Sequence, residues 1–172
     1  FADFTKQYIF KPLQMNSSGW FYNEFFAKNY ATLYEVNKPF DPTFKDFINN
    51  DGSVNIYALA TYPDGSLRTS AEDLSKYLIE MMKGLKGNST LLSANSYKVL
   101  FEKQFSAVNM PTNMSDSEPN RAIFWAFNRK GKLVHSGSDP GLSAFVSIDP
   151  NTNISRVLLL NTSLSGENNA KT

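Results

Sequence analysis

Apolar and polar residues alternate with a period of two along the last third of the chain, and a polar corner interrupts the alternation. Residues 132–149 read KLVHSGSDPGLSAFVSID. The corner at residues 136–141 consists of serine, glycine, aspartate and proline, which are typical of turns. Beyond it, one face carries Leu142, Ala144, Val146 and Ile148, and the other carries Ser143, Phe145, Ser147 and Asp149. The pattern predicts a β-hairpin with a six-residue connection.

Strand-like runs also precede and follow this hairpin. Residues 122–129 predict a strand with Phe124 and Ala126 on one face, and residues 129–132 predict a turn. On the opposite face of that strand we expect Ile123, Trp125 and Phe127. The last run, residues 154–161, is apolar on both parities at 157–160, as in a central strand covered on both faces. We therefore expect an antiparallel meander that needs helical cover on two sides.

The clearest helical pattern follows Thr69. We expect Thr69 to cap this helix, with Glu72 completing a capping box. The helix is expected to end at Gly84 or Gly87. Its apolar stripe recurs at the helical period and is expected to be core: Leu74, Tyr77, Leu78, Met81, Met82 and Leu85.

Two further helices are predicted. One covers residues 1–10, and the other begins after Ser93 as its cap. The second helix is expected to face inward with Tyr97, Leu100 and Phe101. Between the first helix and Thr69, residues 20–64 read as irregular packing, with a proline-containing loop at 38–42 and a turn at 50–52. The fold class predicted is α+β, an antiparallel β-meander packed with helices.

Composition narrows the class of protein. A chain of 172 residues with 41% hydrophobic and 14% aromatic content is expected to form a single globular domain. A net charge of +1 argues against nucleic acid and anionic membranes as partners. The absence of cysteine excludes disulfides and thiolate metal sites, and with one histidine it argues against zinc. We therefore expect no metal and no cofactor. We also expect no membrane span, because no apolar run reaches about 18 residues.

The only histidine, His135, stands at a strand end and is followed by Ser136 and Gly137. For an arbitrary sequence, a solvent-facing histidine in a hairpin is the favoured interpretation. A histidine beside a serine also suggests acyl-transfer catalysis at the edge of an active site. Composition and spacing alone leave both interpretations open.

Three stretches resemble one family in order along the chain. Residues 135–141, HSGSDPG, resemble the third active-site motif of the serine β-lactamases and penicillin-binding-protein-like hydrolases, in which Lys or His, then Ser or Thr, then Gly line the site from an edge strand. Residues 9–15, IFKPLQM, resemble the family's PLGM segment, with Gln14 where glycine is usual. Residues 62–74, YPDGSLRTSAEDL, resemble its PAGGLxSTxxDL segment, with Asp64 and Ser66 as departures.

The resemblance points to the class C-like and esterase-like branch and implies roles for the third motif only. His135 would supply positive or hydrogen-bonding character to the site and to a substrate carboxylate. The Ser136 hydroxyl would bind that carboxylate or join the proton relay. Gly137 would let the backbone approach the substrate. The N–H of Ser138 would be one of two oxyanion-hole donors. The predicted catalytic residues are thus His135, Ser136 and Ser138, with Gly137 in substrate binding.

The resemblance also exposes a gap. No serine in the chain has lysine three residues later, so the family's Ser-x-x-Lys nucleophile is not within these 172 residues. Ser93-Ala94-Asn95 fits the family's second motif formally, but helix capping explains it. We therefore expect residues 1–172 to be the C-terminal portion of a β-lactamase-like domain, without the nucleophile segment and the final helix, and inactive alone.

The resemblance implies a serine hydrolase that cleaves a β-lactam, a D-amino-acid peptide or an ester through an acyl-enzyme, in a periplasmic or secreted bacterial protein. Expected partners are the small-molecule or peptide substrate and the missing N-terminal part of the same protein. A chain that is stable alone is expected to dimerise or to expose an apolar patch. The alternatives are a non-catalytic module that binds a ligand or peptide on the same scaffold, and an unrelated α+β domain.

Overall fold

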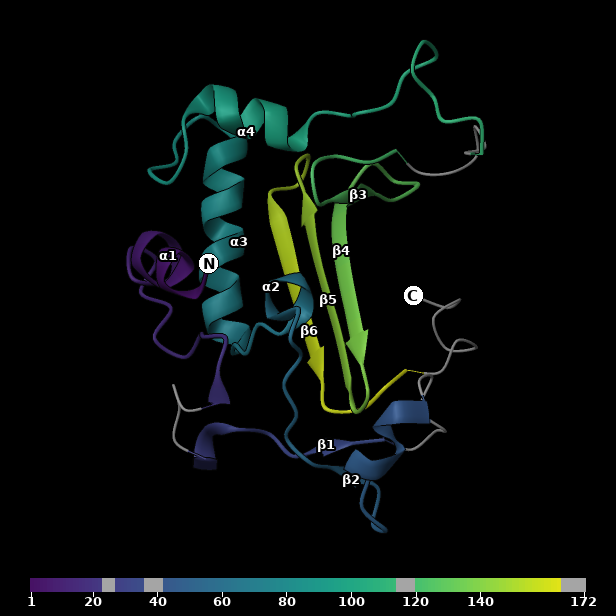
Figure 1. Cartoon of the computed structure of the whole chain (residues 1–172). Coiled ribbons are helices and arrows are strands. Elements are labelled where there is room, and N and C mark those ends of the chain that lie inside the picture. The colour runs from purple at the N-terminus through teal and green to yellow at the C-terminus, as the bar shows by residue number, and fades with distance from the viewer. Residues whose placement is uncertain (23–26, 36–41, 114–119, 165–172) are drawn as a thin grey trace.

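The structure is a computed structural model that describes residues 1–22, 27–35, 42–113 and 120–164. In Figure 1 a helix lies alongside an antiparallel sheet, and a short two-stranded sheet lies near one end of it. The elements in chain order are α1 Ala2–Thr5, η1 Lys6–Phe10, η3 Ala27–Asn29, β1 Leu33–Tyr34, η4 Pro42–Phe47, β2 Ser53–Val54, α2 Tyr62–Gly65, α3 Ala71–Leu85, α4 Ala94–Phe101, β3 Ala126–Phe127, β4 Leu133–Asp139, β5 Leu142–Asp149 and β6 Ile154–Leu160.

The predicted antiparallel meander is confirmed, with strand order β3-β4-β5-β6. The predicted six-residue connection is wrong, because β4 continues to Asp139 and pairs with Leu142. Only Pro140 and Gly141 form the turn. Proline presets φ for the first turn position, and Gly141 takes the second at φ +74°. A Cβ there would also come within 2.9 Å of Leu33 and Val54 side-chain atoms, so the turn packs tightly against β1 and β2.

The last strand is not central among the described strands. β6 pairs with β5 and forms the end of the sheet. Ile154 and Leu158 are 47% and 46% exposed, whereas alternate residues such as Val157 pack toward the core. The apolar residues on both faces of this strand predict that both faces are covered. In the described chain, one face of β6 and its outer edge are left uncovered.

The strand predicted over residues 122–129 is much shorter. Only Ala126 and Phe127 form β3. Before it, the N–H of Ala122 donates to the carbonyl of Trp125 at 2.8 Å, and Phe124 has a φ of +59°. This tight turn breaks the alternation, so the predicted faces are wrong: Ala122 and Trp125 are buried, and Phe124 is 86% exposed.

The helices follow the sequence prediction with one shift. The cap of α3 is Ser70 rather than Thr69, because the Ser70 hydroxyl accepts from the N–H of Asp73 at 3.1 Å. Gly84 lies within α3, and Gly87 follows its end at φ +74°. The Ser93 cap of α4 is confirmed, as is the first helix, formed by α1 and η1.

The core lies between the sheet and the helices α3 and α4. In Figure 1, α3 runs alongside β6 and α4 lies across one end of the sheet. Tyr97, predicted to face inward, is 1% exposed. The buried cluster comprises Leu78, Met81, Tyr97, Phe101, Ala122, Trp125, Leu133 and Ile148. The predicted α+β fold, an antiparallel meander packed with helices, is confirmed.

Residues 20–64 contain only short elements where the structure describes them, as predicted. The predicted loop at 38–42 lies outside the described residues except for Pro42. The predicted turn at 50–52 is confirmed, and Gly52 has a φ of +81° there. In the described part of the chain, no helix has the length and apolar character needed to cross a membrane.

Candidate active site

The four residues of the proposed third motif lie on one open strand edge. β3 pairs with β4 only at Val134 and Leu133. From residue 135 to 139, β4 has no strand partner on that side among the described residues. His135, Ser136, Gly137 and Ser138 are all exposed. An open edge leaves backbone groups available to a ligand, which can then pair with the strand.

The register decides which backbone groups face outward. Asp139 and Leu142 close the two-residue turn, so they form a hydrogen-bonded pair of the antiparallel ladder. Because such pairs alternate, Gly137 also directs its N–H and C=O toward β5. Ser136 and Ser138 then direct theirs away from β5, into the open edge. The N–H of Ser138 is thus placed where an external acceptor could reach it.

Ring packing holds His135 at this edge. Its ring meets the buried Trp125 edge-on, with centroids 6.3 Å apart, and Trp125 in turn meets Phe101 of the core at 5.9 Å. His135 and Ser136 both line a cavity of about 390 Å³, together with Arg121 and Phe124. The sole histidine is therefore neither sealed in the core nor remote from a cavity.

The Ser138 hydroxyl is weakly engaged within the chain. It donates to the carbonyl of Leu142 at 3.4 Å, a long hydrogen bond. A Cβ built on Gly137 would have no neighbouring atom within 4 Å, so the strand has open space at that position. The motif thus presents a bare backbone stretch between two exposed serines.

A buried carboxylate anchors the tip of the hairpin, and local sequence pattern did not reveal it. Glu35, 7% exposed, accepts from the N–H of Gly141 at 3.0 Å and also from the Ser163 hydroxyl. The Tyr57 hydroxyl donates to the carbonyl of Pro140 at 3.3 Å. These partners lie far from the hairpin in sequence, and no periodicity of the chain links them to it. They fix the end of β4 from which Ser138 projects.

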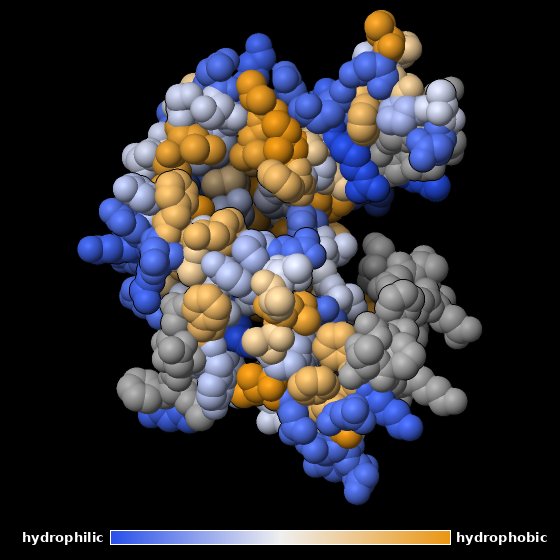
Figure 2. Space-filling view, viewed as in Figure 1, coloured by the Kyte–Doolittle hydropathy of each residue, from blue (hydrophilic) through white to orange (hydrophobic). Residues whose placement is uncertain are grey.

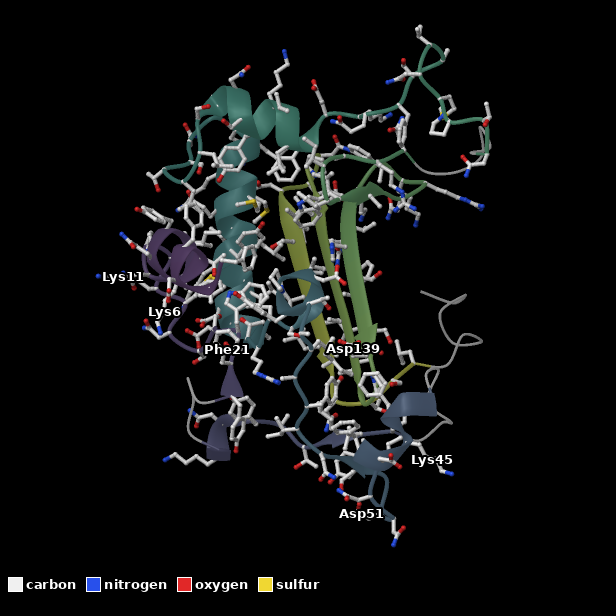
Figure 3. The ribbon with its side chains drawn as sticks, viewed as in Figure 1. Lys6, Lys11, Phe21, Lys45, Asp51 and Asp139 are labelled. Carbon is white, nitrogen blue, oxygen red and sulfur yellow. The ribbon has the colours of Figure 1, made fainter. Side chains whose placement is uncertain are left out.

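The tip also carries an acidic group in a partly desolvated place. Asp139 lies at the end of β4 that faces β1 and β2 (Figure 3). Burial raises the pKa of Asp139, and the nearby charge of Asp64 raises it further. Among the described residues, no group of three or more His, Asp or Glu side chains is arranged to hold a metal ion.

The other two motif-like stretches are joined through residues just beyond their ends, and Asp64 of the second stretch also lies near Asp139 at the end of β4. Asp73, 2% exposed, accepts from the N–H of Ser17 at 2.6 Å and from the Ser18 hydroxyl at 3.0 Å. Lys76 donates to the carbonyl of Gln14 at 2.8 Å. Gln14 has a φ of +55°, the left-handed region that favours glycine, where the PLGM segment usually has one. These stretches join the N-terminal segment to the start of α3, which is a structural role.

Comparison with solved structures shows the fold. A penicillin-binding protein from Bacillus halodurans matches with a TM-score of 0.68 at 20% identity, covering 95% of this chain and 45% of that one. A class C beta-lactamase matches at 0.66 and 14% identity, covering 98% and 49%. The octameric penicillin-binding protein homologue from Pyrococcus abyssi matches at 0.65 and 20% identity, covering 93% and 33%. The chain thus spans less than half the length of each of these proteins.

Another neighbour broadens the chemistry represented on this fold. A D-stereospecific amidohydrolase from Streptomyces sp. matches with a TM-score of 0.62 at 13% identity, covering 94% of this chain and 44% of that one. No curated protein sequence matches the chain. The family model described as Beta-lactamase matches residues 1–172, the whole chain. The chain therefore belongs to the beta-lactamase family of hydrolases and has the β-lactamase and transpeptidase-like fold.

Proposed function

We propose that this chain is the C-terminal, substrate-binding portion of a serine acyl hydrolase that works through an acyl-enzyme. The observation that carries the proposal is the open edge of β4, where His135, Ser136, Gly137 and Ser138 are exposed beside a cavity. Substrates of the class would be β-lactams, D-amino-acid peptides or esters. Structural neighbours named as a class C beta-lactamase and a D-stereospecific amidohydrolase support that range.

The Ser138 N–H would act as an oxyanion donor. A nucleophilic serine attacks the substrate carbonyl carbon, its proton passes to a base, and the carbonyl oxygen becomes an oxyanion. A donor aimed at that oxygen lowers the barrier, because the charge develops only in the transition state. The leaving amine or alcohol takes a proton, and water then hydrolyses the acyl-enzyme. The nucleophile and the second donor would come from polypeptide outside these 172 residues.

The neighbouring side chains would hold the substrate. His135 and Ser136 direct their side chains to opposite faces of β4, yet both line the same cavity. Their imidazole and hydroxyl groups suit a substrate carboxylate. Gly137 follows Ser136 on β4 and has no side chain to keep a substrate away from the strand.

The remainder of the protein would complete the sheet. The outer edge of β6 has no strand partner among the described residues, and Ile154 and Leu158 are 47% and 46% exposed. An edge of this kind pairs readily with another strand. We propose that the N-terminal part of the same protein covers it, and that a second copy covers it when that part is absent.

A pair of substitutions at Ser138 tests the catalytic role in the full-length gene product. Ser138→Pro removes the outward N–H without removing a bond of the β4–β5 ladder, so it should preserve folding. We expect kcat for nitrocefin, p-nitrophenyl acetate or a D-amino-acid p-nitroanilide to fall by about 100- to 1000-fold. Ser138→Ala keeps the N–H and should stay within a few-fold of the parent protein.

Thermal melts of both variants provide the control for folding. Equal activity of Ser138→Pro and Ser138→Ala, with both variants folded, would contradict the proposal that the Ser138 N–H is an oxyanion donor. A full-length protein that binds β-lactams or peptides in the cavity without any turnover would instead support a non-catalytic binding module. The absence of Ser-x-x-Lys in this chain is the observation that favours that second candidate.

A further inference from the structure

Phe124 occupies a backbone conformation that aromatic residues rarely adopt. Its φ is +59°, in the turn closed by the Ala122 N–H and the Trp125 carbonyl at 2.8 Å. The turn position with positive φ is normally filled by glycine or asparagine, because a Cβ crowds the backbone there. The surrounding structure imposes this conformation: Arg121 pairs with Ala126, and the Ile123 N–H donates to the Leu100 carbonyl at 3.1 Å.

Burial within the described chain does not offset this strain. The Phe124 residue is 86% exposed, whereas its neighbours Ala122 and Trp125 are 6% and 7% exposed. An exposed, strained residue is a reason to look for function at that position. Phe124 lines the same cavity as His135 and Ser136. The strained turn therefore places an aromatic ring at the wall of the candidate substrate site.

The cavity combines an apolar wall with groups that bind anions. Arg121, which is exposed, contributes a permanent positive charge. His135 and Ser136 contribute hydrogen-bonding groups, and Phe124 contributes a ring. A volume of about 390 Å³ suits a small molecule. The chemistry that fits all four residues is a carboxylate with an aromatic or bulky apolar group beside it.

We propose that Phe124 and Arg121 are specificity determinants that select substrates with an aromatic group next to the carboxylate. The ring of the substrate stacks on Phe124, and its carboxylate lies between Arg121 and His135. This inference rests on the proposed function, because it takes the His135 cavity as the carboxylate side of the substrate site.

Binding of small probes to the full-length gene product tests the inference without requiring turnover. The probes are N-acetylphenylalanine, N-acetylalanine and N-acetylphenylalaninamide, which separate the ring from the charge. We expect N-acetylphenylalanine to bind more tightly than either of the others in isothermal titration. Phe124→Gly should weaken the binding of N-acetylphenylalanine about tenfold and leave the affinity for N-acetylalanine unchanged. Arg121→Gln should weaken the binding of both carboxylate probes and leave the affinity for the amide probe unchanged.

Phe124→Gly gives a second, independent readout. Glycine removes the backbone strain, so the melting temperature should rise while the preference for the ring is lost. Phe4→Ala, which removes another exposed phenylalanine at 61% exposure in α1, should change neither affinity.

The inference is overturned if Phe124→Gly lowers the melting temperature and leaves all three affinities unchanged, as expected for a ring buried by another part of the protein. Failure of the proposed function looks different. Binding that depends on the ring, in a protein with no turnover, would support the aromatic subsite and contradict the proposed hydrolase function. Turnover that is insensitive to Phe124→Gly and to the ring of the substrate would support the hydrolase function and contradict the aromatic subsite.

Discussion

Gly137 separates the two exposed serines of β4, and the space beside it is empty. A Cβ built there meets no atom within 4 Å, and its φ is not in the left-handed region. The position therefore does not need glycine for folding. If β4 is the substrate-binding edge, the position needs glycine so that the substrate can approach the strand.

Gly137→Ala should accordingly separate stability from activity. We expect the melting temperature to stay constant or rise slightly, because alanine restricts the unfolded chain more than glycine does. We expect kcat/KM of the full-length protein to fall about 100-fold, the effect of displacing a substrate by about 1 Å. Gly65→Ala is the matched control, since its Cβ also meets open space. Equal activity of both variants would place the substrate elsewhere.

The individual residues also show what local sequence can and cannot predict. The motif at His135 was identified from residue types and order, and the structure places it on an exposed edge. The alternation predicts a strand face for Phe124, because it carries no information on the sign of φ. Glu35 was missed because its partners Gly141 and Ser163 lie more than 100 residues away in sequence. Long-range polar contacts leave no periodic signal.

Among the elements, boundaries were harder to predict than identities. The helical period predicts α3 and most of its buried side, but Leu85 of the expected stripe is 37% exposed and the cap shifts by one residue to Ser70. Thr69 and Ser70 are both good caps. Thr69 instead pairs with the Ser18 hydroxyl at 2.7 Å, a contact with a distant segment. Tertiary contact thus decides between two locally equivalent residues.

The turn between β5 and β6 depends on an ionised carboxylate. Asp149 accepts from the N–H of Asn151 at 3.1 Å and of Thr152 at 3.3 Å, and Lys132 lies 3.1 Å away. The hydrogen bond from Lys132, followed by the turn N–H groups, lowers the pKa of Asp149 to about 2. The ionised form is thus bound more strongly in the folded state than in the unfolded state.

This shift predicts acid sensitivity with a defined sign. Because the folded-state pKa is lowered, the stability is fully present above the ordinary aspartate pKa of about 4 and is lost as pH falls toward 2. Thermal melts by circular dichroism from pH 7 to pH 2 should show a smaller acid-induced drop for Asp149→Asn than for the parent chain. Lys132→Met should flatten the profile in the same direction. Parallel pH profiles for all three proteins would contradict the assignment.

At the level of the whole molecule, the described chain covers the sheet on one side with α3 and α4 and leaves apolar groups elsewhere. Phe145 and Leu158, adjacent across β5 and β6, are 39% and 46% exposed. Figure 2 shows further apolar atoms gathered over the helices α3 and α4. Exposed apolar residues in and between these helices include Ile79, Leu92 and Val99, at 42% to 47%. Exposed apolar surface of this kind is typical of a site that another segment or another chain covers.

The fold class followed from periodicity, but the extent of the domain did not. Alternation and the helical period predicted an α+β meander, and the family match agrees. Residues 157–160 are apolar on both faces of their strand, which also predicts that the sheet needs cover on two sides. That apolar character indicates that cover is needed, but it carries no information on which polypeptide provides it.

Mass spectrometry of the acyl-enzyme tests the central claim most directly. The full-length gene product is incubated with a β-lactam or an activated ester, digested, and the acylated residue is located. We predict a single adduct on a serine followed three residues later by lysine, outside these 172 residues, and its loss or strong slowing in Ser138→Pro. An adduct on any serine of this chain, or acylation at the parent rate in Ser138→Pro, would contradict the account.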